Sequence, residues 1–131
     1  FPPYEIAIEE ALRLEPPVLF VPRVVNTTFD YAGFRLKKGQ ILILSLSAAN
    51  RDPEIVREPH RFRVDRQDAT HISFGHCIHL CLGMTLARIE SKIVLTRLFE
   101  KFPNMRLTDT SPDWDPSPMF RGLGSLRLIA K

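Results

Sequence analysis

Apolar residues recur at helical spacing in two well-separated segments of the chain. Residues 4–14, YEIAIEEALRL, have one pair of prolines before them and another after them, at the positions where proline begins and ends helices. In residues 82–102, LGMTLARIESKIVLTRLFEKF, apolar side chains again follow the helical period up to Pro103. We therefore predict a helix over residues 4–14 and a second, longest helix that begins near Leu82 and ends before Pro103.

Between these two helices the pattern changes to short runs of β-branched and aromatic residues. Residues 19–25, 27–36 and 41–47 have this composition, and the pairs Ala32-Gly33 and Lys38-Gly39 supply turns within it. Residues 48–71 are rich in Pro, Asp and Arg and are expected to be irregular, with at most one helical turn. Strand-like runs return in the tail at 105–107 and 125–130. The fold class predicted is α+β, mainly α with a small β-sheet.

Composition limits the classes of protein that the chain can belong to. With 44% hydrophobic and 25% charged residues, its 131 residues have the balance of a globular domain. The net charge of +3 comes from scattered Lys and Arg, which does not indicate a nucleic-acid interface. No apolar run reaches the roughly 20 residues of a membrane-spanning helix. The two cysteines are four residues apart, so a disulfide between them would close almost no loop, and we expect a reducing, cytoplasmic location.

The segment FGHCIHLCLG, residues 74–83, concentrates the reactive chemistry just before the long helix. Cys81 stands where the helix dipole and free backbone N–H groups stabilise a thiolate and can tune a metal bound to it. Gly75 and Gly83 would let a flat molecule approach the backbone closely, and His79 could reach an anionic group on it. A thiolate-bound haem iron is one ligand that would use all of these features.

Spacing alone leaves two other interpretations open. Cys81 could be an unreactive buried cysteine in a loop, since free cysteine is among the most buried residue types. The chain could also be a small metal-binding module, because His76, Cys77, His79 and Cys81 offer four ligands within six residues. Structural zinc sites, however, usually draw their ligands from two separated pairs. The Cys-x-x-Cys-His pattern of covalently attached haem is absent.

Residues 74–83 resemble the haem-binding loop of the cytochrome P450 family, whose pattern is Phe-x-x-Gly-x-x-x-Cys-x-Gly. Phe74, Cys81 and Gly83 match that pattern, and the sequence around them is similar to soluble bacterial members. Position 77 departs from it, because Cys77 stands where the family usually has glycine. If that position needs a positive φ angle, cysteine there costs about 1–2 kcal/mol.

Further motifs of the same family occur upstream, in the family's order. The pair Glu10 and Arg13 resembles the Glu-x-x-Arg motif, and residues 59–62, PHRF, resemble the Pro-x-Arg-Phe motif. The resemblance implies a structural triad of Glu10, Arg13 and Arg61. It also implies that Arg23 and His79 bind the haem propionates.

The resemblance implies a haem-thiolate monooxygenase that inserts one oxygen atom from O₂ into a small hydrophobic substrate. Cys81 would be the axial ligand of haem b (iron protoporphyrin IX), with Phe74, Gly75 and Gly83 beside it and no other catalytic residue in this chain. Electrons would come from NAD(P)H through a ferredoxin- or flavodoxin-type partner. That partner could dock near two basic residues of the long helix, Arg88 and Lys92. The candidate residues of the substrate pocket are Leu19, Val21, Met119 and Phe120.

Residues 1–131 would then form the C-terminal portion of a single cytochrome P450 domain. The helix that activates oxygen and most of the substrate pocket would precede Phe1, so this chain alone is expected to be inactive. It should also leave one face of the haem uncovered and a large apolar surface exposed. The alternative to a functional fragment is an inactive gene remnant. Outside the motifs, His71 and His76 are interpreted as surface residues.

Overall fold

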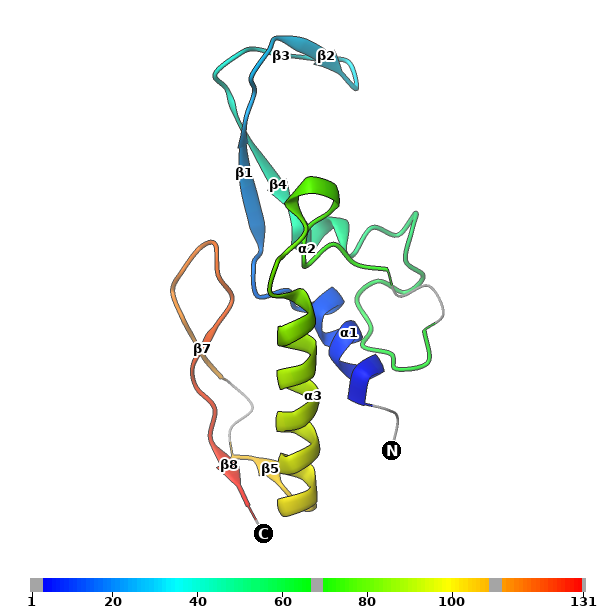
Figure 1. Cartoon of the computed structure of the whole chain (residues 1–131), viewed down its shortest axis with the longest axis vertical. Coiled ribbons are helices and arrows are strands. Elements are labelled where there is room, and N and C mark those ends of the chain that lie inside the picture. The colour runs from blue at the N-terminus through cyan, green and yellow to red at the C-terminus, as the bar shows by residue number, and fades with distance from the viewer. Residues whose placement is uncertain (1–3, 67–69, 109–111, 131) are drawn as a thin grey trace.

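Two helices form the body of the molecule and lie side by side (Figure 1). The computed structural model describes residues 4–66, 70–108 and 112–130. Helix α1 spans Tyr4–Leu14 and helix α3, the longest, spans Met84–Lys101. Both predicted helices are therefore confirmed, while the prolines expected to begin the first one, Pro2 and Pro3, lie outside the described residues.

The strands form separate antiparallel pairs rather than one sheet. Strand β1 (Phe20–Val24) pairs with β4 (Ile41–Ser45), and the chain between them extends into the hairpin of β2 (Phe29–Tyr31) and β3 (Phe34–Leu36). Ala32 and Gly33 at the hairpin turn both have positive φ, as a two-residue type I′ turn requires. Figure 1 shows this hairpin projecting away from the two helices.

The tail folds back beside α3 and adds two further pairs of short strands. Strand β5 (Arg106–Leu107) pairs with β8 (Leu128–Ile129), and β6 (Asp113–Trp114) pairs with β7 (Leu123–Ser125). Among the described residues the predicted small sheet is thus four two-stranded pairs. The α+β class, mainly α, is confirmed.

The segment after β4 is irregular, as expected, apart from one short helix. That helix, α2 (Leu46–Ala49), begins two residues before the segment in which a helical turn was predicted. The side-chain oxygen of Ser45 caps it by accepting the N–H of Ala48 at 3.2 Å. The irregular chain that follows then passes around α1 (Figure 1).

Arg13 on α1 is fully buried, and its guanidinium holds this irregular segment in place. It donates two hydrogen bonds to the carboxylate of Glu10, at 2.7 and 2.9 Å. It also donates to the carbonyl oxygens of Asn50 at 3.0 Å, Pro59 at 2.8 Å and Arg61 at 3.2 Å. A guanidinium has five N–H donors, so this burial is fully compensated.

The prediction that the Arg61 side chain is the third member of the triad is wrong. The side chain of Arg61 is 72% exposed and pairs with Glu58, so only its backbone carbonyl takes part in the network. Arg66 replaces it: its side chain is 1% exposed, and its Nε donates to Glu10 at 2.9 Å. The backbone carbonyl, not the side chain, of residue 61 faces Arg13.

Burial of Glu10 would raise the pKa of its carboxyl, but its hydrogen bonds act in the opposite direction. Arg13, Arg66 and the backbone N–H of Arg63 all donate to the carboxylate. Together they hold the pKa of Glu10 below its ordinary value. Glu10 is therefore a charged acceptor at neutral pH and completes the network around Arg13.

A large apolar surface is exposed around α3, as expected. No residue of α3 is fully buried, and Leu82 and Ile78 beside it are 102% and 92% exposed. The fully buried apolar residues of the described chain are few, and they lie around α1, β1, α2 and the irregular segment. The described part of the chain contains no helix long and apolar enough to cross a membrane.

We predict that Arg66→Ala lowers the free energy of unfolding by about 3–5 kcal/mol, because it removes one partner of a buried ion pair. Urea unfolding followed by circular dichroism measures the change. Arg61→Ala is the matched control, since it removes an exposed guanidinium from the same segment, and it should leave the unfolding midpoint almost unchanged. Equal losses in the two variants would contradict the assignment of Arg66.

Candidate functional site

The loop of residues 74–83 is closed by its own backbone. The N–H of Cys81 donates to the carbonyl of Phe74 at 2.7 Å, across a short 3₁₀ turn formed by Cys77–His79. The carbonyl of Cys81 then accepts the N–H of Met84, the first residue of α3, at 3.2 Å. Cys81 is thereby fixed between a closed loop and the amino end of a long helix, where N–H groups favour a thiolate.

Two residues of the loop have left-handed backbone conformations. Gly75 has φ +79°, and a Cβ atom there would lie 2.5 Å from the carbonyl oxygen of His79, so only glycine fits. Cys77 has φ +50° without being glycine. The strain expected from cysteine at position 77 therefore has a structural basis.

Cys81 is exposed, which excludes the interpretation of an unreactive buried cysteine. Cys77 is also exposed, and neither thiol forms a disulfide. Among the residues that the structure describes, no three His, Cys, Asp or Glu side chains are grouped so that they could hold a metal ion. The crowded His and Cys residues of the loop thus do not form a zinc site in this conformation.

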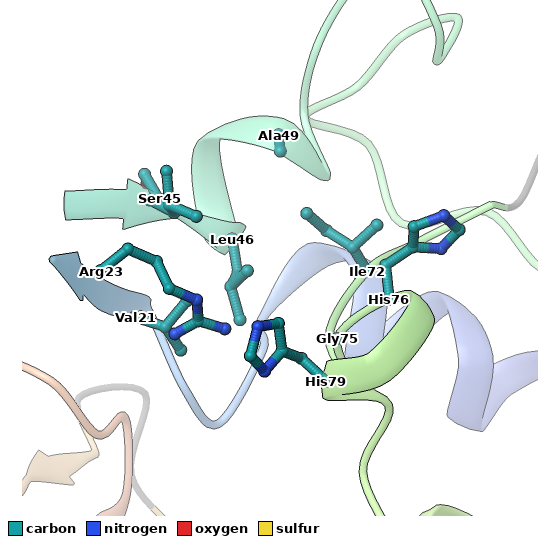
Figure 2. Close-up of a pocket in the computed structure, with 10 residues that line it drawn as sticks. Val21, Arg23, Ser45, Leu46, Ala49, Ile72, Gly75, His76 and His79 are labelled. Atoms are coloured by element: carbon teal, nitrogen blue, oxygen red, sulfur yellow. The ribbon is translucent and has the colours of Figure 1, made fainter. Parts of the chain in front are cut away.

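A pocket of about 400 Å³ opens between strands β1 and β4 and the Cys81 loop (Figure 2). Its walls include the apolar side chains of Val21 and Leu46 together with the backbone of Gly75. Figure 2 shows the side chains of Arg23 and His79 pointing toward one another across the pocket, one from β1 and one from the loop. The structure thus brings together two residues far apart in sequence that were both predicted to bind propionates.

The pocket has the properties that a haem edge requires. In the described part of the chain no carboxylate lies within ion-pair distance of Arg23, whose guanidinium donates only to the carbonyl of Pro22, at 2.8 Å. A cationic side chain over apolar walls fits an anionic group on a flat apolar ligand. Gly83 lies beside the sulfur of Cys81, since a Cβ at that position would be 3.9 Å from Sγ of Cys81. The residues present therefore fit haem.

Asn50, which supports the start of this loop, was not among the predicted site residues. Asn50 is 2% exposed, and its side chain accepts the N–H of Ile72 at 2.9 Å and donates to Ser73 Oγ at 2.8 Å. Ser73 Oγ in turn donates to the carbonyl of Leu12 at 2.7 Å. Asn50 thus ties the start of the Cys81 loop to α1. No periodicity marks it, because it belongs to an irregular segment.

The interpretation of His71 as a surface residue is wrong, whereas His76 is exposed. The side chain of His71 is 4% exposed and lies 3.1 Å from a carboxylate oxygen of Glu9. Its burial depends on α1 folding against the loop, which local sequence cannot reveal. His76 lines the pocket beside Ile72 (Figure 2).

The basic residues on α3 proposed for partner docking both pair with α1. Arg88 forms two hydrogen bonds with Glu9, at 2.7 and 2.6 Å, and Lys92 pairs with Glu5. Hydrogen bonding from Lys92 lowers the pKa of Glu5, so the carboxylate of that pair is charged at neutral pH. These cations therefore join the two helices and carry less unbalanced charge than the sequence suggested.

The tail brings its candidate pocket residues against the chain before β1. The N–H of Leu19 donates to the carbonyl of Met119 at 2.9 Å, and Phe120 forms an isolated antiparallel bridge with Val18. Arg121 stacks on Trp114, with its guanidinium carbon 4.0 Å from the ring centroid, and pairs with Glu15 at the end of α1. Leu19, Met119 and Phe120 therefore lie together, while Val21 lines the pocket with Arg23.

Comparison with known proteins places these features in one family. The family model described as cytochrome P450 matches residues 2–125. The biotin biosynthesis cytochrome P450 of Bacillus subtilis is 40% identical over 114 residues, which cover 87% of this chain and 28% of that protein. Cytochrome P450 monooxygenase PikC of Streptomyces venezuelae is 41% identical over 126 residues, which cover 93% of this chain and 30% of that protein.

A solved structure gives the same result. P450BioI, in complex with an acyl carrier protein ligated to hexadec-9Z-enoic acid, superposes with a TM-score of 0.92 at 37% sequence identity. The match covers 98% of this chain and 34% of that structure. The chain thus spans about a third or less of the length of these relatives.

We predict opposite effects of substitution at the two left-handed positions of the loop. Cys77→Gly should raise the free energy of unfolding by about 1 kcal/mol, because glycine adopts positive φ without steric cost. Gly75→Ala should lower it by more than that, because its Cβ would collide with a backbone carbonyl. Urea unfolding measures both. Destabilisation by Cys77→Gly would show that its thiol makes a compensating contact.

Proposed function

The chain belongs to the cytochrome P450 family, and from that premise we propose that it is the haem-binding, C-terminal portion of a monooxygenase domain. The observation that carries the proposal is the placement of Cys81. Its thiol is exposed at the amino end of α3, beside a pocket that presents Arg23 and His79. When bound to this thiolate, haem would favour cleavage of the O–O bond of O₂, so that one oxygen atom is inserted into a substrate and the other is reduced to water by the electrons from NAD(P)H.

Each side chain of the site has a distinct part in this proposal. Cys81 binds the iron of haem b, and Gly75 and Gly83 keep the backbone close to the ring. Arg23 and His79 bind the propionates, because their nitrogen-bearing side chains point toward one another across the pocket. Phe74 is the first residue of the Cys81 loop, and its carbonyl accepts the hydrogen bond that closes the loop.

The remainder of the active site would come from a portion of the protein outside this chain. The chain covers only about a third of a solved relative, and the apolar surface around α3 has no cover within the described residues. We propose that an N-terminal portion of the same domain packs there and closes the second face of the haem. Without it the chain is expected to be inactive, as it would also be if it were a gene remnant.

The substrate proposed is a small hydrophobic molecule. Leu19, Met119 and Phe120 lie together, and Val21 lines the neighbouring pocket. Apolar residues therefore gather where β1 begins. Apolar walls favour apolar ligands through the area they remove from water. A hydrophobic ligand should therefore shift the haem absorption band of the loaded protein, and a polar one of equal size should not.

We propose that electrons come from NAD(P)H through a ferredoxin- or flavodoxin-type protein. We also propose a cytoplasmic location, which cell fractionation would test. Of the two cations considered for docking, Lys92 is the more available. Its side chain is 54% exposed, whereas Arg88 is 37% exposed and held by two hydrogen bonds to Glu9. We therefore assign the docking contact to Lys92.

Haem titration of the chain tests the function. We expect binding at one site per chain and, after reduction under carbon monoxide, the difference spectrum of a thiolate complex. Cys81→Ala should abolish that spectrum because it removes the ligand, and Cys77→Ala, the matched control, should keep it. A thiolate spectrum that survives in Cys81→Ala, or stoichiometric zinc lost in both variants, would overturn the proposal.

Charge reversal tests the docking contact. Lys92→Glu should slow reduction of the haem-loaded protein by an acidic ferredoxin at low salt, because steering between opposite charges controls the association rate. Stopped-flow absorbance measures the rate. Arg97→Glu, an 80% exposed position farther along α3, is the control. An unchanged rate in Lys92→Glu at low salt would exclude this contact.

A further inference from the structure

Four side chains from three segments meet beside the Cys81 loop. We propose that Glu9, His71 and Arg88 form a positioning cluster against Phe74 and that the Glu9–Arg88 ion pair sets the reduction potential of the iron bound to Cys81. The inference rests on the proposed function, since it concerns haem held by this loop. It reassigns Arg88 from partner docking to support of the loop.

The Glu9–Arg88 pair joins α1 to α3 with fixed geometry. Nε and one terminal nitrogen of Arg88 donate to the two carboxylate oxygens of Glu9, at 2.7 and 2.6 Å, and each side chain is about two-thirds buried. Hydrogen bonding from Arg88 lowers the pKa of Glu9, and the same contact raises the pKa of Arg88. Both groups therefore stay charged, in the two-pronged arrangement that only arginine provides.

His71 holds the carboxylate from the other side. The backbone N–H of Ser73 donates to Nδ1 of His71 at 3.3 Å, so the hydrogen on the ring belongs to Nε2. Nε2 lies 3.1 Å from Oε2 of Glu9 and donates to it. Glu9 is thus held by donors both from the segment just before the Cys81 loop and from α3.

Phe74 transmits this arrangement to the ligand. The guanidinium of Arg88 lies over its ring, 4.9 Å from the centroid, and the His71 ring is tilted against it at 6.1 Å. The carbonyl of Phe74 accepts the N–H of Cys81 at 2.7 Å. One residue therefore separates the cluster from the iron ligand. A shift of Phe74 would move the backbone that fixes the sulfur.

The two charges of the pair should act on the iron with opposite signs. Reduction adds an electron, so a nearby positive charge favours the reduced state and a negative charge disfavours it. Glu9→Gln leaves the charge of Arg88 uncompensated and should raise the reduction potential. Arg88→Gln leaves the charge of Glu9 uncompensated and should lower it. A merely structural role would not give opposite shifts.

Spectroelectrochemical titration of the haem-loaded chain and its variants tests the inference. Arg88→Lys keeps the charge but loses the two-pronged contact, so its potential should stay near that of the wild type. Haem affinity should fall about 10- to 100-fold in Arg88→Gln, as for other residues that support a metal ligand. Arg97→Gln, which breaks the exposed pair with Glu100 on the same helix, is the control and should change neither quantity.

Opposite shifts in Glu9→Gln and Arg88→Gln, with Arg88→Lys near the wild type, support the inference. Shifts in the same direction, or none, while the wild type keeps its thiolate carbon monoxide spectrum, overturn the inference and leave the proposed function standing. A wild-type chain that binds haem without a thiolate spectrum overturns both. If either glutamine variant fails to fold, Arg88→Lys decides. A reduction potential that shifts away from the wild type together with a loss of haem affinity in this variant contradicts the role of charge.

Discussion

The burial of one guanidinium constrains the rest of this structure. Arg13 has no exposed surface, so each of its N–H groups needs an acceptor inside the protein. Glu10 supplies two, and carbonyls of Asn50, Pro59 and Arg61 supply the others, which forces an irregular segment to pass around α1. The side chain of Asn50 then binds Ile72 and Ser73, where the Cys81 loop begins. The position of Cys81, the proposed iron ligand, thus depends on a charge buried far from it in sequence.

The elements that could be predicted from the sequence, and the residues proposed for the site, are those with a local signature. Paired prolines mark α1, helical periodicity marks both long helices, and a short motif marks Cys81 and Gly83. Arg66, His71 and Asn50 could not be found in this way, because each takes its role from a carboxylate or backbone group on another segment. The motif PHRF indicates Arg61, whereas Arg66 lies outside that motif. The motif is right about the segment, but its backbone, rather than its side chain, faces Arg13.

The exposed apolar surface has the same origin as the incomplete pocket. Helix α3 has no fully buried residue although it carries many apolar side chains, and β1 and β4 form a pair with apolar residues such as Ile41 and Ile43 exposed. Helices of ordinary globular proteins bury one apolar face. In the proposed function, a chain that spans about a third of its relatives would hold the side of the site that binds the iron, and the facing layers would come from the rest of the domain.

Glu9 and Glu10 are adjacent on α1, yet their partners Arg88 and Arg66 lie 79 and 56 residues away along the chain. Neither contact can form until a long loop has closed, and loop closure precedes any gain from the contacts it allows. The helix itself can form early and with it the local pair of Glu10 and Arg13, while the Glu9 side chain is still hydrated. The order of events during synthesis therefore matters. Helix α1 leaves the ribosome well before Arg88, so the contacts around the Cys81 loop should assemble only once most of the chain is available.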